Sequence, residues 1–215
     1  MNFTDQLRDS SAWEEATRHR FVEQYRDGAL EDDVFRSYLV EDYAFLEMGA
    51  RVTALAAADA PTMDEMGYLA DQLAVLTGGE NDYFLRAFEE LGVPEHEYEE
   101  SDLHPTTEAF NDFMLRVANQ HGYEETLAAV TAAEWVYLDW CTYAGETDHD
   151  RWYLEEWIDI HVVKEFEDYV DWLRTQLDEL GPQLSSRREE RIERTFRRTV
   201  ELEARFFDAA YDTEL

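Results

Sequence analysis

Apolar residues recur every three or four positions through nearly all of this 215-residue sequence, and the strict apolar/polar alternation of half-buried strands is almost absent. The longest stretches with helical periodicity span 124–144, 151–180 and 186–211, and shorter ones precede them. Helices of this length joined by short connections pack as bundles. The sequence therefore predicts an all-α protein, a compact bundle of about seven or eight helices.

Residues that start and stop helices mark several expected boundaries. Gly28 is placed to end the first helix, which begins near Trp13. Thr62 fits an N-cap, and the helix that follows it is interrupted at 77–79 (Thr-Gly-Gly). The longest irregular stretch is 93–105, and its Pro105 is expected to open the next helix.

No linker-like segment rich in Pro, Gly or Ser divides the chain, so we expect a single domain over residues 1–215. Cys141 is the only cysteine, which excludes an internal disulfide. The first residues lack the basic start and apolar core of a signal peptide, and no window approaches about 20 uncharged apolar residues. These features predict a soluble cytoplasmic protein with no membrane partner.

The chain is strongly acidic, with 51 Asp and Glu against 18 Lys and Arg and a formal charge of -33. A surface this negative repels nucleic acid and anionic lipid, which excludes both as partners. Because the acids are spread over all expected helices and 45% of the residues are hydrophobic, the pattern is not that of an acidic tail. We expect a salt-rich cytoplasm, in which dissolved ions screen the repulsion.

Glu134 stands out because it interrupts an apolar run, 127–140, and no other charge occurs from Thr126 to Leu138. An ionised carboxylate inside a helix bundle costs several kcal/mol (order of magnitude) unless a partner or ligand compensates it. Tyr137 lies three residues later, on the same helix face. The residues alone leave two readings open: a functional acid, or a buried acid satisfied by a tyrosine or by backbone.

Asp42 and Glu203 are less distinctive. Asp42 shares a helix face with Tyr38 and Phe45, and its neighbour Glu41 points about 100° away, where it is expected to be solvated. Glu203 lies in a segment that reads as an amphipathic surface helix. By themselves both acids are best explained as surface or capping residues.

Metal and cofactor motifs are weak or missing. The only Glu-x-x-His spacing, Glu146 to His149, falls in an expected turn, and His161 with Glu165 gives a single i,i+4 pair. A haem site would have to use His19, with no further support. No glycine-rich phosphate loop, nucleophile elbow or Cys-x-x-Cys occurs. We expect no metal and no cofactor.

Five segments, in this order, resemble the TenA/thiaminase II family: HRFVEQYRDGALEDDVFRSYLVEDYAFL (19–46), HPTTEAFNDFM (104–114), AAEWVYLDW (132–140), EEWIDIHVVKEF (155–166) and ELEARFFDAAY (201–211). The resemblance covers most of the chain and implies the haem-oxygenase-like all-α fold. It also implies a homo-oligomer, commonly a tetramer.

The resemblance assigns roles to particular residues. It makes Asp42 the substrate-binding aspartate and Glu203 the catalytic glutamate of the last helix. Tyr137 matches a conserved tyrosine of the site. Two further positions depart from the tyrosine found in many relatives: Phe45 and Phe110, each expected to stack on a pyrimidine. A third departure is His161, also at a position that relatives usually give to tyrosine.

The nucleophile is the main departure. Family members with thiaminase II activity carry a cysteine where this chain has Ala133, and Cys141 lies eight residues out of register. The chain is therefore similar to the cysteine-less branch, often called TenA_E, in which a glutamate pair is thought to replace the thiol. This resemblance implies a thiamine-salvage hydrolase, aminopyrimidine aminohydrolase-like, that acts on an aminopyrimidine or formylaminopyrimidine.

In that reading Glu134 is the general base, or else a nucleophile, and Glu203 is the general acid. Two alternatives stay open at this point. One is a haem-oxygenase-like, metal-dependent oxidase, and the other is a pyrimidine-binding protein without catalytic activity.

Overall fold

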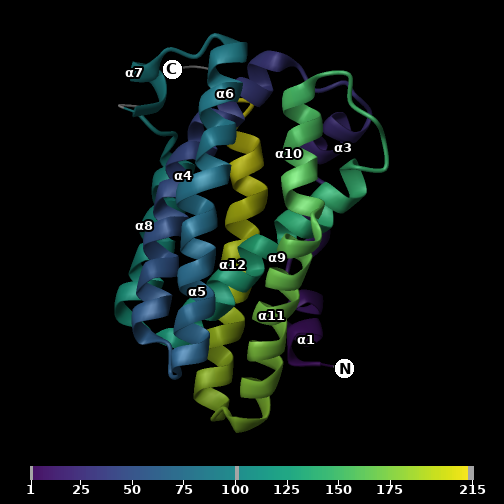
Figure 1. Cartoon of the computed structure of the whole chain (residues 1–215). Helices are drawn as coiled ribbons and strands as arrows, with labels where there is room; N and C mark the ends of the chain where they lie inside the picture. Colours follow the sequence, from purple (N-terminus) through teal and green to yellow (C-terminus); the bar gives the residue numbers. More distant parts are fainter. Residues whose placement is uncertain (1, 100–101, 213–215) are drawn as a thin grey trace. The chain divides into compact units, whose positions relative to one another are not determined.

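The computed structural model describes residues 2–99 and 102–212, and within these ranges the regular structure is helical, with no β-strand (Figure 1). The predicted all-α class is confirmed. By internal contacts the chain divides into two compact units. The first unit comprises Met1–Ala29 with Glu124–Arg205, and the second comprises Leu30–Tyr123 with Phe206–Leu215.

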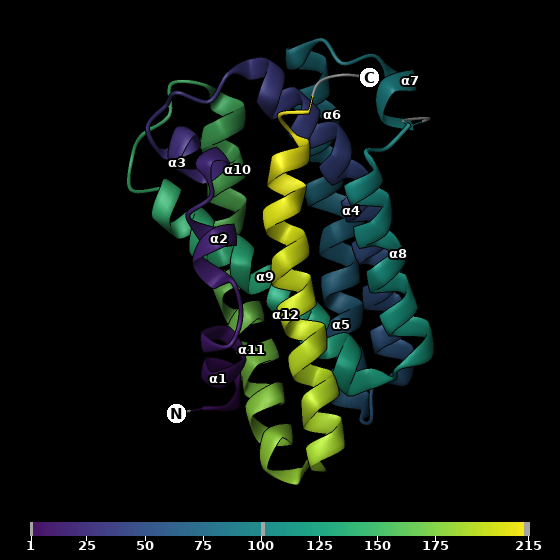
Figure 2. The same ribbon diagram turned by 180° about the vertical axis from the view of Figure 1, so that it is seen from behind.

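The first unit contains the N-terminal helices and the long helices of the second half of the chain: α1 (Phe3–Asp9), α2 (Trp13–Thr17), α3 (Arg20–Arg26), α9 (Tyr123–Ala144), α10 (Trp152–Val162), α11 (Lys164–Leu180), the 3-10 turn η2 (Gly181–Gln183) and α12 (Ser186–Ala209) as far as Arg205. Figure 2 shows α1 beside α11, where the backbone N–H of Thr4 donates to Asp178 at 2.8 Å.

Large aromatic side chains fill the interior of the first unit. Trp140 of α9 and Trp157 of α10 are 0% exposed, and Tyr25 of α3 packs edge-on against Trp140 with ring centroids 5.4 Å apart. The Tyr25 hydroxyl donates to the backbone carbonyl of Leu154 at 2.7 Å, so this buried phenol is satisfied. These contacts hold α3, α9 and α10 together.

The second unit is built on the longest helix of the chain, α4 (Asp32–Asp59). Its other elements are α5 (Met63–Val75), the π-helical turn η1 (Leu76–Glu80), α6 (Asn81–Leu91), α7 (Glu95–Glu99), α8 (Pro105–Gln120) and the last turn of α12. Figure 1 shows α5 and α8 running alongside α4. An aromatic cluster links α4, α6 and α7: Tyr43 packs against Phe84, Phe88 and Tyr98, each at a centroid distance of 5.5 Å.

Helix ends marked by a specific residue type agree with the sequence. The Thr62 hydroxyl accepts a hydrogen bond from the backbone N–H of Glu65 and caps α5. Pro105 opens α8 at its first turn, and Gly28 adopts the left-handed φ of 66° just beyond α3. The interruption predicted at 77–79 is the π-helical turn η1.

Three stretches differ from the expectation. The helix expected from Trp13 to Gly28 is divided between α2 and α3, because the ring of His19 turns back and accepts a hydrogen bond from the N–H of Phe21. The helix expected over 151–180 is divided at Val163, whose ψ of 147° is extended. The stretch 93–105, expected to be irregular, contains the short helix α7.

Within the described residues, no helix combines the length with the apolar character that crossing a bilayer requires.

Candidate functional site

The seven candidate residues are distributed over both compact units, so we describe each group within its own unit. Asp42, Phe45 and Phe110 belong to the second unit. The first unit holds Glu134, Tyr137, His161 and Glu203.

In the second unit the two candidate phenylalanines lie against each other. Phe45 of α4 and Phe110 of α8 have ring centroids 4.8 Å apart at an interplanar angle of 51°. The ring of Phe206, in the last turn of α12, is 5.8 Å from that of Phe45 and 6.5 Å from that of Phe110. Because an intervening ring needs about 7 Å between the rings that sandwich it, these three side chains form a single wall.

Phe206 was missed by the sequence reasoning as a member of this wall. The sequence feature that could have identified Phe206 is its position one turn after Glu203, next to a second aromatic residue, Phe207. Phe207 stacks on Tyr38 at 6.1 Å and 23°, and Phe206 meets the same ring edge-on at 5.8 Å. Both aromatic residues therefore pack in the second unit, and Phe206 also joins the wall.

Asp42 lies on α4 three residues before Phe45 and is only 4% exposed. Its neighbour Glu41 is 7% exposed, so the expectation that Glu41 is solvated was wrong. Both Glu41 carboxylate oxygens accept from the backbone N–H of His104, at 3.1 and 3.2 Å. Residue His104 is the N-cap of α8, where unpaired N–H groups favour a carboxylate. Glu41 therefore positions α8, the helix of Phe110.

In the first unit, Glu134 and Tyr137 lie one turn apart on α9, on one helix face. Glu134 is half-buried, and Tyr137 is 6% exposed. The residue before Glu134, at the position where thiaminases of the family carry cysteine, is the buried Ala133. The only thiol, Cys141, is 0% exposed.

Glu203 of α12 is 0% exposed, although the sequence alone suggested a surface position for it. Three apolar residues near it on α12, Val200, Leu202 and Phe206, are also buried, each 2% exposed or less. The burial of Glu203 is a feature that functional acids share.

The His161 ring is enclosed by aromatic side chains at the end of α10. Its centroid lies 5.3 Å from that of Tyr137, 4.4 Å from that of Trp157 and 5.3 Å from that of Phe166. The His161 Nδ1 atom is 2.8 Å from the backbone carbonyl oxygen of Trp157. Burial lowers the pKa of His161 from 6.5 to about 4, against a smaller opposing effect of the Trp157 carbonyl.

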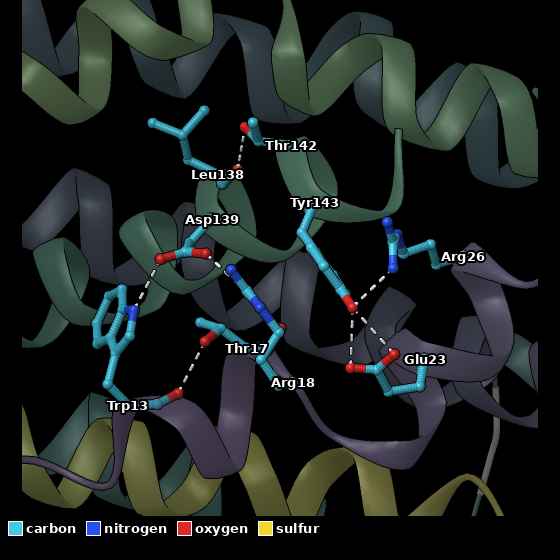
Figure 3. Close-up of polar contacts among 9 residues, drawn as sticks. All are labelled: Trp13, Thr17, Arg18, Glu23, Arg26, Leu138, Asp139, Thr142 and Tyr143. Atoms are coloured by element: carbon cyan, nitrogen blue, oxygen red, sulfur yellow. Dashed lines mark hydrogen bonds and ion pairs between the residues drawn. The ribbon is translucent and has the colours of Figure 1, made fainter. Parts of the chain in front are cut away.

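A polar cluster on the N-terminal side of the first unit was not foreseen (Figure 3). Asp139 of α9 accepts hydrogen bonds from Trp13 Nε1 at 2.8 Å and from Arg18 at 2.9 Å. One turn later, the Tyr143 ring lies between two guanidinium groups, those of Arg18 at 4.1 Å and Arg26 at 4.3 Å.

The hydroxyl of Tyr143 completes this cluster. It receives a hydrogen bond from Arg26 at 3.0 Å and donates to the carboxylate of Glu23, whose oxygens are 3.1 and 3.2 Å away. The cluster fastens α2 and α3 to α9, the helix that carries Glu134 and Tyr137. Each of these side-chain contacts joins residues more than 100 positions apart in sequence, so no local pattern could reveal the cluster.

The weak metal motifs do not converge. Within residues 2–99 and 102–212, no group of three or more His, Cys, Asp or Glu side chains is arranged to hold a metal ion. Glu146 instead pairs with Arg26 at 2.9 Å. Because α10 ends at Val162, His161 and Glu165 are not on a common helix, and the proposed i,i+4 pair does not exist.

The architecture is that of the haem-oxygenase-like helical proteins. A protein of that fold from Shewanella denitrificans aligns with a TM-score of 0.75 at 15% identity, covering 99% of this chain and 93% of its own. A TenA homologue from P. horikoshii aligns with a TM-score of 0.88 at 23% identity over 99% of each chain. These likenesses establish the fold.

Sequence comparison identifies the family. Residues 7–213 match the TENA/THI-4/PQQC family, and the chain belongs to it. It is 30% identical over 207 residues to an aminopyrimidine aminohydrolase of Halalkalibacterium halodurans, an alignment that covers 94% of this chain and 92% of that enzyme. The family expected from the five sequence segments is confirmed.

Proposed function

We propose that this protein is an aminopyrimidine aminohydrolase of thiamine salvage. The observation that carries the proposal is its similarity, over 94% of the chain, to an enzyme of that name. The reaction is hydrolysis of a C–N bond: water replaces the exocyclic amine of a 4-amino-5-aminomethyl-2-methylpyrimidine and releases ammonia. A formylamino derivative of the same ring is the second substrate we consider, because its C–N bond is open to the same attack.

The position of the thiol supports a mechanism without cysteine. Ala133 stands where a nucleophilic cysteine would be, and Cys141 is fully buried about 12 Å further along the helix axis. A water molecule activated by a carboxylate is then the simplest nucleophile that this chain can provide. We expect thiamine itself not to be cleaved, since that reaction depends on the thiol in the members that perform it.

For the chemical step we assign Glu134 as general base and Glu203 as general acid. Glu134 takes a proton from water as the oxygen forms its bond to carbon, and Glu203 gives a proton to the departing nitrogen. Glu203 is fully buried whereas Glu134 is half-buried, and unequal surroundings are what two carboxyl groups need to hold different protonation states. Direct attack by Glu134 is the variant of this scheme, and it would leave a transient ester.

The remaining candidates are assigned to substrate recognition. Asp42 would hydrogen-bond the amidine edge of the ring, a pairing that suits a carboxylate facing two adjacent N–H or N sites. The wall formed by Phe45, Phe110 and Phe206 would take one face of the pyrimidine. Tyr137 would fix the side from which the amine departs, three residues along α9 from the general base.

The test is a substrate panel followed by mass spectrometry. Purified protein is incubated separately with the aminomethylpyrimidine, its formylamino derivative and thiamine. We expect loss of ammonia and gain of a hydroxymethyl group from the first compound, and no cleavage of thiamine. If calorimetry detects binding of the pyrimidines but no product forms from any of them, the protein is a binding protein and the proposal fails.

We further propose that the protein works as a homotetramer in a salt-rich cytoplasm, as one family domain. The family match runs through both compact units, which supports a single domain. Met63, Val75 and Leu85 of the second unit are large apolar side chains exposed by 77%, 54% and 40%, which is consistent with burial between subunits. Light scattering coupled to gel filtration measures the subunit number directly.

A further inference from the structure

The imidazole of His161 is held in one tautomer by its contact with the backbone. A carbonyl oxygen can only accept a hydrogen bond, so the Nδ1 atom, 2.8 Å from the Trp157 oxygen, must carry the proton. A neutral ring carries one proton, and therefore Nε2 presents a lone pair. Burial keeps the ring neutral at physiological pH, since it moves the pKa to about 4.

The lone pair of Nε2 is unused within the described residues. His161 is 5% exposed, and its only hydrogen bond is the one made by Nδ1. Nε2 is not among the fully enclosed polar atoms that lack a partner, so it is a part of the ring that a ligand can reach. A ligand that brings an N–H group to this atom would give the lone pair a hydrogen-bond donor.

The location of His161 connects this acceptor to the proposed chemistry. Its ring contacts Tyr137, at a centroid distance of 5.3 Å, and Tyr137 lies one turn from Glu134 on α9. All three residues belong to the first compact unit. A substrate whose reacting carbon is near Glu134 and Tyr137 therefore carries its leaving group into the neighbourhood of His161.

We propose that Nε2 of His161 accepts a hydrogen bond from an N–H of the exocyclic amine of the substrate and selects amines over ethers at that position. The inference rests on the proposed function and names its leaving-group specificity. A tyrosine, which relatives carry at this position, could donate as well as accept and would not discriminate in this way. In the fixed tautomer Nε2 of His161 can only accept, and an ether oxygen placed beside it would bring a second lone pair against the first.

The test compares binding of two ligands of matched size: 4-amino-5-(methylaminomethyl)-2-methylpyrimidine and its 5-methoxymethyl analogue, which lacks the N–H donor at that position. Calorimetry is carried out in a Glu134→Gln background to prevent turnover. We expect His161→Phe, which retains an aromatic ring, to reduce the preference for the amine by about tenfold. His161→Gln, whose amide oxygen can reach the place of Nε2, is expected to retain most of that preference.

A second measurement needs no substitution at His161. Nitrogen-15 NMR of histidine-labelled protein distinguishes a protonated Nδ1 from a protonated Nε2. We expect the free protein to show the Nδ1–H tautomer and the Nε2 resonance to shift on addition of the amine. His96 is exposed on α7, and its nitrogen resonances should not shift when the amine is added. The variant His96→Gln identifies these resonances, so they serve as the control.

The outcomes separate this inference from the proposed function. If wild-type protein turns over no pyrimidine but the amine still shifts the Nε2 signal and His161→Phe still loses the preference, the acceptor role stands and hydrolysis does not. An unchanged preference in a folded His161→Phe protein, an Nε2–H tautomer in the free protein, or failure of both pyrimidines to bind would overturn the inference.

Discussion

Two carboxyl groups are assigned to catalysis, and the proposed general base can be tested by removing its acidity while retaining its shape. Glu134→Gln cannot take a proton from water, so we expect turnover of the aminopyrimidine to fall by about 10²–10⁴-fold, as for loss of a general base. Because Glu134 is half-buried, the melting temperature should change little. Steady-state kinetics and a thermal melt measure the two effects.

Glu89→Gln provides the matched control, since Glu89 is an exposed glutamate of α6. It should leave both turnover and stability unchanged. Near-normal activity of Glu134→Gln on every pyrimidine in the panel would remove Glu134 from the mechanism.

His161 also makes a prediction about stability against pH. Its pKa is about 4 in the folded protein and about 6.5 when unfolded, so the unfolded chain binds more protons between these values. The neutral, buried His161 therefore does not oppose folding above pH 6.5, and the folded state loses stability as the pH falls from 6.5 toward 4. As the pH falls from 7 to 4.5, protonation of His161 in the unfolded chain should lower the free energy of unfolding by about 2–3 kcal/mol.

Urea unfolding at several pH values measures this dependence, and the comparison with His161→Phe isolates the contribution of one residue from that of the many carboxylates. The variant should lose less stability than the wild-type protein over the same interval. Parallel curves for the two proteins would contradict the assignment of a neutral, buried imidazole.

At the scale of elements, the junction between α9 and α10 depends on a glycine. A Cβ atom at Gly145 would lie 2.7 Å from Ile158 Cγ2 and 3.0 Å from the carbonyl oxygen of Cys141. We therefore expect Gly145→Ala to lower the free energy of unfolding by about 1–3 kcal/mol. Gly67→Ala, in the exposed middle of α5 with open space around the new atom, should instead raise it by about 0.5–1 kcal/mol.

Chemical denaturation of both variants measures whether each one lowers or raises the free energy of unfolding. If Gly145→Ala proved as stable as Gly67→Ala, the close approach of α10 to the end of α9 would be in error.

A second contact between elements joins the start of α9 to the start of α12. The Glu125 carboxylate is 0% exposed and accepts from Arg191 Nε at 2.9 Å and from Arg188 Nη2 at 3.2 Å. Glu125→Gln removes the charge and turns one acceptor oxygen into an N–H donor that faces a guanidinium group, although Arg188 keeps Glu124 at 2.9 Å. We therefore expect a cost of about 2–3 kcal/mol. The arginines are about one-third exposed, and solvent therefore limits the loss.

Calorimetric melting is the appropriate measurement, with Glu190→Gln on the exposed side of α12 as the control. The control should fall within about 0.5 kcal/mol of wild type. A Glu125→Gln protein as stable as the control would show that the contact of Glu125 with Arg188 and Arg191 does not hold these helices together.

The sequence predicted those elements whose ends have a chemical marker. Thr62, Pro105 and Gly28 mark boundaries because their side chains, or the lack of one, favour a particular backbone conformation. The breaks at His19 and Val163 could not be foreseen, since neither residue is a helix breaker and tertiary packing decides their conformation.

The same distinction applies to the candidate site. Glu134 was recognisable from its apolar flanks alone. Asp42 and Glu203 were not, because acids occupy every helix and only the family resemblance separated them from surface residues. The clamp of Arg18 and Arg26 on Tyr143 depends on the fold, and no periodicity in the sequence encodes it.

For the whole molecule, the charge of -33 is the dominant property. Repulsion among 51 acidic side chains opposes the folded state at low ionic strength, and screening shortens its range from about 10 Å at 0.1 M salt to about 3 Å at 1 M. The melting temperature should therefore rise steadily over this range of sodium chloride. Sucrose of equal osmolality, which carries no charge, should produce a clearly smaller rise. A melting temperature independent of salt would remove the proposed adaptation to a salt-rich cytoplasm.

The thiol of Cys141 can report on opening of the first unit, because its reaction with an alkylating reagent requires that it become exposed. Fully enclosed on α9, it can meet a dissolved reagent only while the helices around it have separated. Because the chain has no other thiol, each alkylated molecule has opened at Cys141. The rate of alkylation therefore measures how often the core beneath the proposed catalytic helix opens.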